Sequence, residues 1–241
     1  MQKSLLFIVM CVLGCCYSCG DPKAEYNELL QDIDVRNTDL LQSYRNADNE
    51  SQQKIVVNKT RQYLTDLLGS KLSTYWYGTP LSADGRTELP RESNTSPVNF
   101  VVTVLRDANF NIDRNALLQQ TPNNVIQALT AEANIKRFEN EEAATFIDRL
   151  HEWGSGVYLL ALDETFGFLV VNACGVRFIY PSKNGVKNED ASLSIPVRES
   201  RVRVLGDFIE TEWSVRKWLA GDAFGGKAPT TNDTASPAKE L

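Results

Sequence analysis

The sequence predicts an α+β fold, in which a group of helices is followed by an antiparallel β-sheet. Two observations support this prediction. Between residues 24 and 153, apolar side chains recur mainly at helical spacing. From Gly156 onward, the pattern changes to short runs rich in β-branched and aromatic residues, separated by turn-forming residues. Helices followed by strands, rather than alternating with them, are typical of the α+β class.

Two amphipathic helices are predicted near the N-terminus, over residues 24–46 and 48–70. Gly69 is expected to end the second helix, since glycine commonly follows the last helical residue. The apolar positions that predict the two helices are Tyr26, Leu29, Leu30, Ile33, Leu40, Leu41, Ile55, Val56, Tyr63, Leu67 and Leu68.

The middle of the chain is predicted to hold an irregular segment and then three helices. Residues 71–94 carry several Gly and Pro residues, which punctuate regular structure. The next helix is predicted over residues 96–110, because Ser96 is a good N-cap and Pro97 is favoured at the first helical position. Further helices are predicted over residues 123–133 and 140–153.

Four short strands are predicted in the C-terminal third, and their close spacing favours an antiparallel meander. Asp163-Glu164, Cys174-Gly175 and the polar stretch 183–194 are expected to separate them. A last helix is predicted over residues 210–220, and the tail 221–241, which has little to bury, is expected to be disordered. The predicted strands are GVYLLALD (156–163), TFGFLVVNA (165–173), GVRFIYPS (175–182) and RVRVLGDF (201–208).

Composition and charge exclude some function classes. The chain has 241 residues, of which 42% are hydrophobic, which is enough for one globular domain with a sizeable core plus tails. Its formal net charge is -6. Because general nucleic-acid binding needs a basic surface to neutralise phosphates, a nucleic-acid partner is not expected.

The N-terminus is predicted to be a targeting segment. Lys3 precedes an apolar run that is too short to span a bilayer, followed by clustered cysteines at positions 11, 15, 16 and 19. This pattern resembles the lipoprotein signals common in Gram-negative bacteria, with residues 1–18 removed and Cys19 carrying the lipid. Cys15 is the alternative lipidation site, since Val12-Leu13-Gly14-Cys15 is also close to the usual motif. An ordinary secretory signal is the remaining alternative.

Lipidation would attach the mature chain to a membrane and would also determine whether its cysteines can form a disulfide. Several fatty acyl chains, palmitate among them, would hold the protein stably at a membrane. If Cys19 is acylated, Cys174 is the one cysteine left, so no disulfide is expected within the domain. His151 is the one histidine. No metal site is therefore expected, and no cofactor is expected either.

A series of motifs along the chain resembles a branch of the NlpC/P60-like, papain-fold hydrolases, whose relatives cleave peptide bonds in cell-wall peptides. The resemblance runs from about Trp76 to about Phe208. The motifs, in order, are WYGTP at 76–80, Gly85, Pro90, FVVTVLRDANF, NIKRF, GVYLLALD, GFLVV, GVRFIY and SRVRVLGDF. The resemblance implies a papain-like fold, in which the helix that carries the nucleophile packs on an antiparallel sheet that carries a histidine.

In that family the catalytic cysteine opens the helix, a histidine lies on a strand and a third polar residue lies on the next strand. The resemblance places Pro97, Thr165 and Tyr180 at these three positions. Proline has no nucleophile, and it also lacks the backbone N–H that this residue contributes to the oxyanion hole in papain-like enzymes. The resemblance therefore implies a domain without its family's catalysis.

Other residues offer only weak replacements for the lost chemistry. Ser96 and Thr165 are hydroxyls without an evident base nearby in sequence. Cys174 is better explained by a hairpin turn, and His151 by a helix surface. Asp163 and Glu164 are interpreted as a charged turn rather than as an acid–base pair.

The groove expected from the resemblance is also altered. Trp76, Tyr77 and Gly78 keep the family pattern, but Leu81, Ala83 and Asp84 stand where the family typically has aromatic residues and an Asn. The candidate groove residues are Trp76, Tyr77, Gly78, Ser96, Asn99 and Thr165. Core packing of Trp76 and its neighbours is the equally weighted alternative.

Together these observations divide the chain into a signal peptide (1–18), an N-terminal helical region (19–70), an NlpC/P60-like domain (71–220) and a tail (221–241). The leading hypothesis is a lipid-anchored protein of the bacterial cell envelope, facing the periplasm or the cell surface. It would bind a cell-wall peptide or an envelope protein without cleaving it. The alternatives are a hydrolase that uses non-standard residues, and a structural or assembly lipoprotein.

Overall fold

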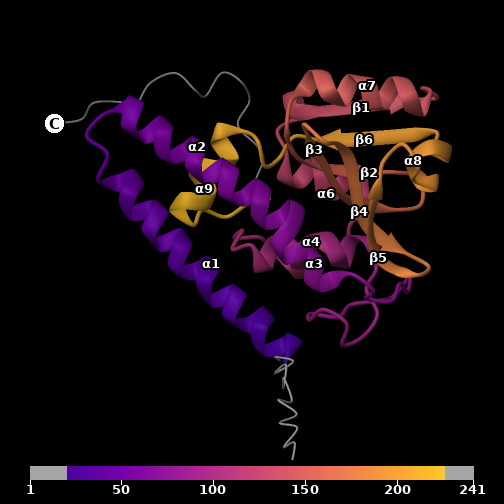
Figure 1. Cartoon of the computed structure of the whole chain (residues 1–241), viewed down its shortest axis with the longest axis horizontal. Helices are drawn as coiled ribbons and strands as arrows, with labels where there is room; N and C mark the ends of the chain where they lie inside the picture. The colour runs from indigo at the N-terminus through magenta and orange to yellow at the C-terminus, as the bar shows by residue number, and fades with distance from the viewer. Residues whose placement is uncertain (1–20, 226–241) are drawn as a thin grey trace, which may run out of the picture.

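The computed structural model describes residues 21–225, so the predicted signal peptide and both candidate lipidation cysteines lie outside the described residues. Figure 1 shows two long N-terminal helices on one side of the molecule and a β-sheet on the other. The predicted α+β class is confirmed. The helices are α1 (Pro22–Arg45), α2 (Glu50–Asp66), α3 (Leu72–Trp76), α4 (Pro97–Asp107), α5 (Arg114–Leu117), α6 (Pro122–Leu129), α7 (Ala143–Trp153), α8 (Ile195–Glu199) and α9 (Glu212–Ala220).

The strands form one six-stranded sheet in the order β1-β6-β2-β3-β4-β5, and all neighbours are antiparallel. Strands β2 to β5 form an antiparallel meander, but its fourth strand is β5, which was not predicted, and not the predicted strand at residues 201–208, which is β6. The last strand, β6, returns to lie between β1 and β2. The bounds are β1 (Ile135–Glu139), β2 (Gly156–Ala161), β3 (Phe166–Asn172), β4 (Gly175–Ser182), β5 (Gly185–Asp190) and β6 (Val202–Gly206).

The two predicted N-terminal helices are present, but the second does not end at Gly69. Asp21 caps α1 and Asn49 caps α2 through their side chains, which explains why both helices begin where they do. After α2 the chain makes one π-helical turn, Leu67–Lys71, and continues into α3. The expected irregular segment therefore begins after Trp76 rather than at residue 71.

Two apolar cores cover the two faces of the sheet. The first joins the N-terminal helices, α4, α6 and α9 to the sheet face formed by residues such as Leu159, Phe168 and Ile179. The second lies between the opposite face of the sheet and the helices α7 and α8. Alternate residues of each strand therefore enter different cores, as the two-residue period of a strand requires. Since α1 and α2 share a core with α4, they are an integral part of the folded unit.

Several elements were not predicted from the sequence. Strand β5 lies in the predicted polar stretch 183–194, whereas β1, α5 and α8 lie between the predicted elements. The tail was expected to begin at residue 221, but Phe224 is 5% exposed and its ring packs edge-on against Phe110 and Phe208. The chain therefore remains part of the core to at least this residue. No helix among residues 21–225 is long and apolar enough to cross a membrane.

Candidate functional site

Helix α4 begins as the sequence predicted. Ser96 is its N-cap, and the Ser96 hydroxyl oxygen accepts a hydrogen bond from the Asn99 N–H at 3.3 Å. Pro97 occupies the first turn, where its missing N–H leaves no intrahelical bond unmade. The position that the resemblance assigns to a nucleophile is thus used for helix initiation.

The segment before α4 is held against the helix start by close backbone contact. The Ser96 N–H donates to the Gly85 carbonyl oxygen at 3.0 Å. A Cβ atom at Gly85 would lie 2.4 Å from the backbone carbonyl carbon of Thr95, so no larger residue fits there without a shift of the backbone. Gly85 therefore sets one wall of the space in front of α4.

That space is a pocket of about 680 Å³ between the start of α4 and the β2–β3 turn. Its volume lies within the range of about 300–1,000 Å³ typical of ligand sites. Ser96, Pro97 and Thr165 all line it, although Thr165 is far from the other two in sequence. The other lining residues are Ala83, Asp84, Gly85, Arg86, Val98, Leu118, Gln120, Thr121, Pro122, Asn123, Arg137, Ala161, Leu162, Asp163, Glu164 and Val202. We call this space the α4 pocket.

The wall formed by the β2–β3 turn is fixed by its own hydrogen bonds. The Thr165 hydroxyl donates to the Pro181 carbonyl oxygen at 3.4 Å, and Thr165 is 6% exposed. The Asp163 carboxylate accepts the backbone N–H groups of Arg201 and Val202 at 2.7 and 3.1 Å. Both bonds lower the pKa of Asp163, and the bond from Arg201 has the larger effect. The prediction that Asp163-Glu164 forms a charged turn is confirmed.

The mouth of the α4 pocket carries charges of both signs. Asp84, Arg86 and Glu164 are exposed, and their side chains make no hydrogen bond or ion pair with any residue in the described range 21–225. Arg137, in contrast, pairs with Glu139 at 2.5 Å. The pocket therefore offers one cation and two anions to a ligand, together with the side-chain amides of Gln120 and Asn123.

Tyr180 does not line this pocket. It lies on β4 and faces the second core, where its ring stacks on Phe178 with centroids 4.5 Å apart. Its hydroxyl donates to Glu189 at 2.6 Å. The expectation that Tyr180 stands beside Pro97 and Thr165 is wrong, because residue 180 has the same strand parity as Phe178 and so points away from α4.

Most of the candidate groove residues also lie elsewhere. Trp76 is fully buried, packs edge-on against Phe100 and donates its indole N–H to the Tyr26 hydroxyl at 3.2 Å. Tyr77 accepts a hydrogen bond from Asn188 beside β5, and the Gly78 N–H donates to the Val186 carbonyl oxygen at 2.8 Å. Core packing thus explains Trp76, and Tyr77 and Gly78 tie the chain to the sheet edge.

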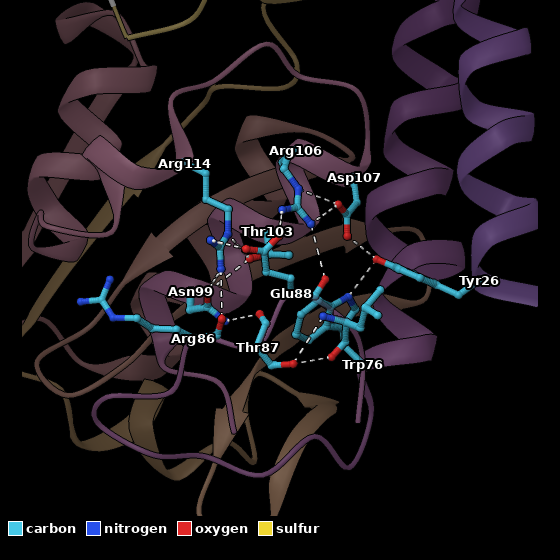
Figure 2. Close-up of polar contacts among 11 residues, drawn as sticks. Tyr26, Trp76, Arg86, Thr87, Glu88, Asn99, Thr103, Arg106, Asp107 and Arg114 are labelled. Atoms are coloured by element: carbon cyan, nitrogen blue, oxygen red, sulfur yellow. Dashed lines mark hydrogen bonds and ion pairs between the residues drawn. The ribbon is translucent and has the colours of Figure 1, made fainter. Parts of the chain in front are cut away.

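Asn99 is buried behind the pocket, in a polar network that the sequence did not reveal (Figure 2). Its side-chain N–H groups donate to the Thr87 carbonyl and the Thr95 hydroxyl, both at 2.9 Å. Its oxygen accepts from Arg114 at 2.6 Å. Since Thr87 directly follows Arg86, this amide fixes the loop that carries the pocket's free cation.

The same network continues along α4 to the N-terminal helix (Figure 2). Arg106 joins Glu88 at 2.7 Å and Asp107 at 2.8 Å, and Asp107 accepts the Tyr26 hydroxyl at 2.5 Å. Burial raises the pKa of Asp107, and the bonds from Tyr26 and Arg106 oppose that rise. Burial also raises the pKa of Tyr26, so its hydroxyl stays protonated and donates.

Two of the residues considered as replacement catalysts, Cys174 and His151, lie away from the α4 pocket. Cys174 is exposed in the β3–β4 hairpin turn, as predicted, and its N–H donates to the Asn172 side chain at 2.8 Å. His151 is exposed on α7. Neither lines the α4 pocket. Within residues 21–225, no group of three or more His, Cys, Asp and Glu side chains is arranged to hold a metal ion.

Comparison of the chain with protein-family models, with curated proteins and with solved structures finds no match.

Proposed function

We propose that this protein is a lipid-anchored protein of the bacterial cell envelope, whose degenerate NlpC/P60-like, papain-type domain binds cell-wall peptides in the α4 pocket without cleaving them. One observation carries the proposal. Pro97 and Thr165, which the motif resemblance pairs as former nucleophile and base positions, line one pocket, and none of its lining residues is His or Cys.

The absence of a nucleophile–base pair in this pocket supports binding rather than hydrolysis. The Ser96 hydroxyl oxygen caps α4, and the Thr165 hydroxyl donates its proton to a backbone carbonyl. Neither hydroxyl has an imidazole or a free carboxylate as a hydrogen-bond partner among the described residues. General-base activation of a hydroxyl requires such a partner within hydrogen-bond reach.

The charges at the pocket mouth suit a ligand that carries both ammonium and carboxylate groups. Cell-wall peptides have free carboxylates and, at their diamino acid, an ammonium group. Arg86 is placed to bind a carboxylate, and Asp84 and Glu164 are placed to bind the ammonium. Gln120 and Asn123 can hydrogen-bond the peptide backbone between them.

Calorimetric titration of the mature, unacylated chain with a purified cell-wall peptide tests this proposal. Arg86→Gln and Glu164→Gln should each weaken binding, since each removes one charge-assisted contact. The matched controls are Arg45→Gln at the end of α1 and Glu152→Gln on α7, both exposed and outside the pocket. Binding that all four variants leave unchanged would contradict the proposed location of the site.

A further inference from the structure

A second cleft lies at the opposite end of strands β2 and β3 from the α4 pocket. It is bounded by α2, the π-helical turn and the segment between β6 and α9, and its volume is about 630 Å³. The π turn brings Gly69 and Ser70 to its edge, and such turns are frequent at functional sites. The lining residues are Asn58, Arg61, Gln62, Thr65, Asp66, Gly69, Ser70, Ser155, Val170, Val171, Asn172 and Glu210. We call it the α2 cleft.

A carboxylate is built into this cleft. Glu210 has a 14% exposed side chain, and one of its oxygens, Oε1, accepts the Thr65 hydroxyl at 2.9 Å and the Val157 N–H at 3.1 Å. A Cβ atom at Gly156 would lie 2.5 Å from the carboxyl carbon of Glu210, so the strand leaves room for the group only because this residue is glycine. Burial raises the pKa of Glu210, and the Val157 and Thr65 bonds oppose that rise.

The second carboxylate oxygen of Glu210 faces Arg61, whose guanidinium also donates to the Asn58 side chain at 2.8 Å. Glu210 Oε2 lies 3.9 Å from Arg61 Nε, which is longer than a hydrogen bond. Arg61 Nε is buried and has no hydrogen-bond partner among the described residues. The Arg61 side chain is 26% exposed, and a ligand hydroxyl group in the cleft would accept from its guanidinium and donate to Glu210 Oε2 at the same time.

The charged groups of the cleft are matched, since Arg61 lies opposite Glu210 and Asp66 pairs with Lys71 at 3.0 Å, so the cleft carries little net charge and suits a neutral ligand. Its rim adds further donors and acceptors for hydroxyl groups, from Gln62, Ser155 and Asn172. We propose that the α2 cleft binds a neutral saccharide, one of whose hydroxyl groups bridges the Arg61 guanidinium and Glu210 Oε2. This site is independent of the α4 pocket and of the peptide binding proposed there.

The test follows the Val157 amide by nuclear magnetic resonance, because this N–H bonds directly to Glu210. The mature, unacylated chain is titrated with di-N-acetylchitobiose and, separately, with maltose. We expect at least one of these disaccharides to bind and to shift the Val157 amide signal. Methylamine and acetate serve as the cationic and anionic probes.

Two variants of the cleft and one matched control test whether the saccharide binds at Arg61 and Glu210. Glu210→Gln keeps an oxygen for the Val157 N–H but replaces the carboxylate, and Arg61→Lys keeps the charge but removes the guanidinium. Each should weaken saccharide binding by about 10- to 100-fold, as expected for loss of a hydrogen bond to a charged group. Glu212→Gln, at an exposed position of α9 two residues after Glu210, should leave affinity unchanged.

Absence of saccharide binding would overturn the proposal. So would binding that leaves the Val157 amide unmoved or survives Glu210→Gln, and so would tighter binding of methylamine or acetate than of either disaccharide. Should Glu210→Gln fail to fold, Arg61→Lys decides the outcome, since that side chain is 26% exposed and its replacement keeps the charge.

Discussion

Tyr26 on α1 donates its hydroxyl hydrogen to Asp107 on α4 at 2.5 Å, joining the first described helix to the helix that forms the wall of the α4 pocket. The same hydroxyl accepts the Trp76 indole N–H. An N-terminal helix close to the predicted lipid anchor is therefore tied by buried polar contacts to the proposed binding domain.

Tyr26→Phe should destabilise the protein, because it removes the hydroxyl from a buried carboxylate and from Trp76. The expected loss is about 1.5–3 kcal/mol in the free energy of unfolding, measured by urea denaturation. Tyr75→Phe is the matched control, since the Tyr75 hydroxyl has no hydrogen-bond partner among residues 21–225 and its ring lies 5.2 Å from that of Tyr26. Equal losses in the two variants would refute the structural role of this bond.

Asp207→Asn should change the pH dependence of stability. Burial raises the pKa of Asp207 above its usual value, and its Oδ1 has no hydrogen-bond partner among the described residues. The folded state therefore binds this proton more tightly than the unfolded state does. Stability from Asp207 is present below the unfolded pKa of about 3.9 and is lost as pH rises through the higher folded pKa.

The Asn variant lacks this titration, so its stability relative to the wild type should increase as pH rises from about 4 and become constant above the folded pKa. Urea denaturation at a series of pH values measures the difference. The same series on Asp34→Asn, on the exposed face of α1, provides the control. A stability difference for Asp207→Asn that does not vary with pH would contradict the proposed cause.

Local signals in the sequence predicted much of the fold. Ser96 and Pro97 define the start of α4 through capping chemistry that involves only neighbouring residues, so that prediction needed no tertiary information. The β5 segment, Gly185–Asp190, carries Lys, Asn, Glu and Asp because it is an edge strand with little to bury, and its polar composition was interpreted as a linker.

The orientation of Tyr180 could not be predicted from its own strand. Phe178, Ile179 and Tyr180 are consecutive and all buried, because helices cover both faces of the sheet. A strand that is apolar on both faces has no alternation from which to assign a face. The presence of Arg86 and Glu164 at one pocket could not be predicted for a different reason, since loops bring them together without any periodic signal.

Introducing a thiol and an imidazole would test whether positions 97 and 165, which the motif resemblance pairs as nucleophile and base, face each other. In the variant Pro97→Cys/Thr165→His the new thiol should titrate below the reference cysteine pKa of about 8.5, because it lies at a helix N-terminus near an imidazole. Replacing Pro97 should cost about 1 kcal/mol or less. Tyr180 is left unchanged, since it faces the other core.

The measurement is the alkylation rate at mildly acidic pH, compared with that of exposed Cys174. The new thiol should react faster than Cys174 and should slow when the Thr165→His change is omitted. If it reacts like an ordinary cysteine with or without the imidazole, positions 97 and 165 do not face each other across the pocket.

The predicted lipid anchor lies outside the described residues and is tested in cells. Radiolabelled palmitate should be incorporated into the protein, and Cys19→Ala should abolish the incorporation, since the lipid would be attached to that thiol. Label that persists in Cys19→Ala and disappears in Cys15→Ala would show that the lipid is attached to Cys15. Label unaffected by either change would rule out the lipoprotein assignment.

The most direct test of the central claim is a single experiment with two readouts. The mature, unacylated chain is mixed with a saturating amount of a purified cell-wall peptide, calorimetry records binding, and mass spectrometry of the same sample records the peptide. We predict measurable binding and a peptide of unchanged mass after prolonged incubation. Cleavage products that are absent when Ser96→Ala replaces the wild type, but persist with Cys174→Ala, would show an enzyme that uses the Ser96 hydroxyl and would contradict the account.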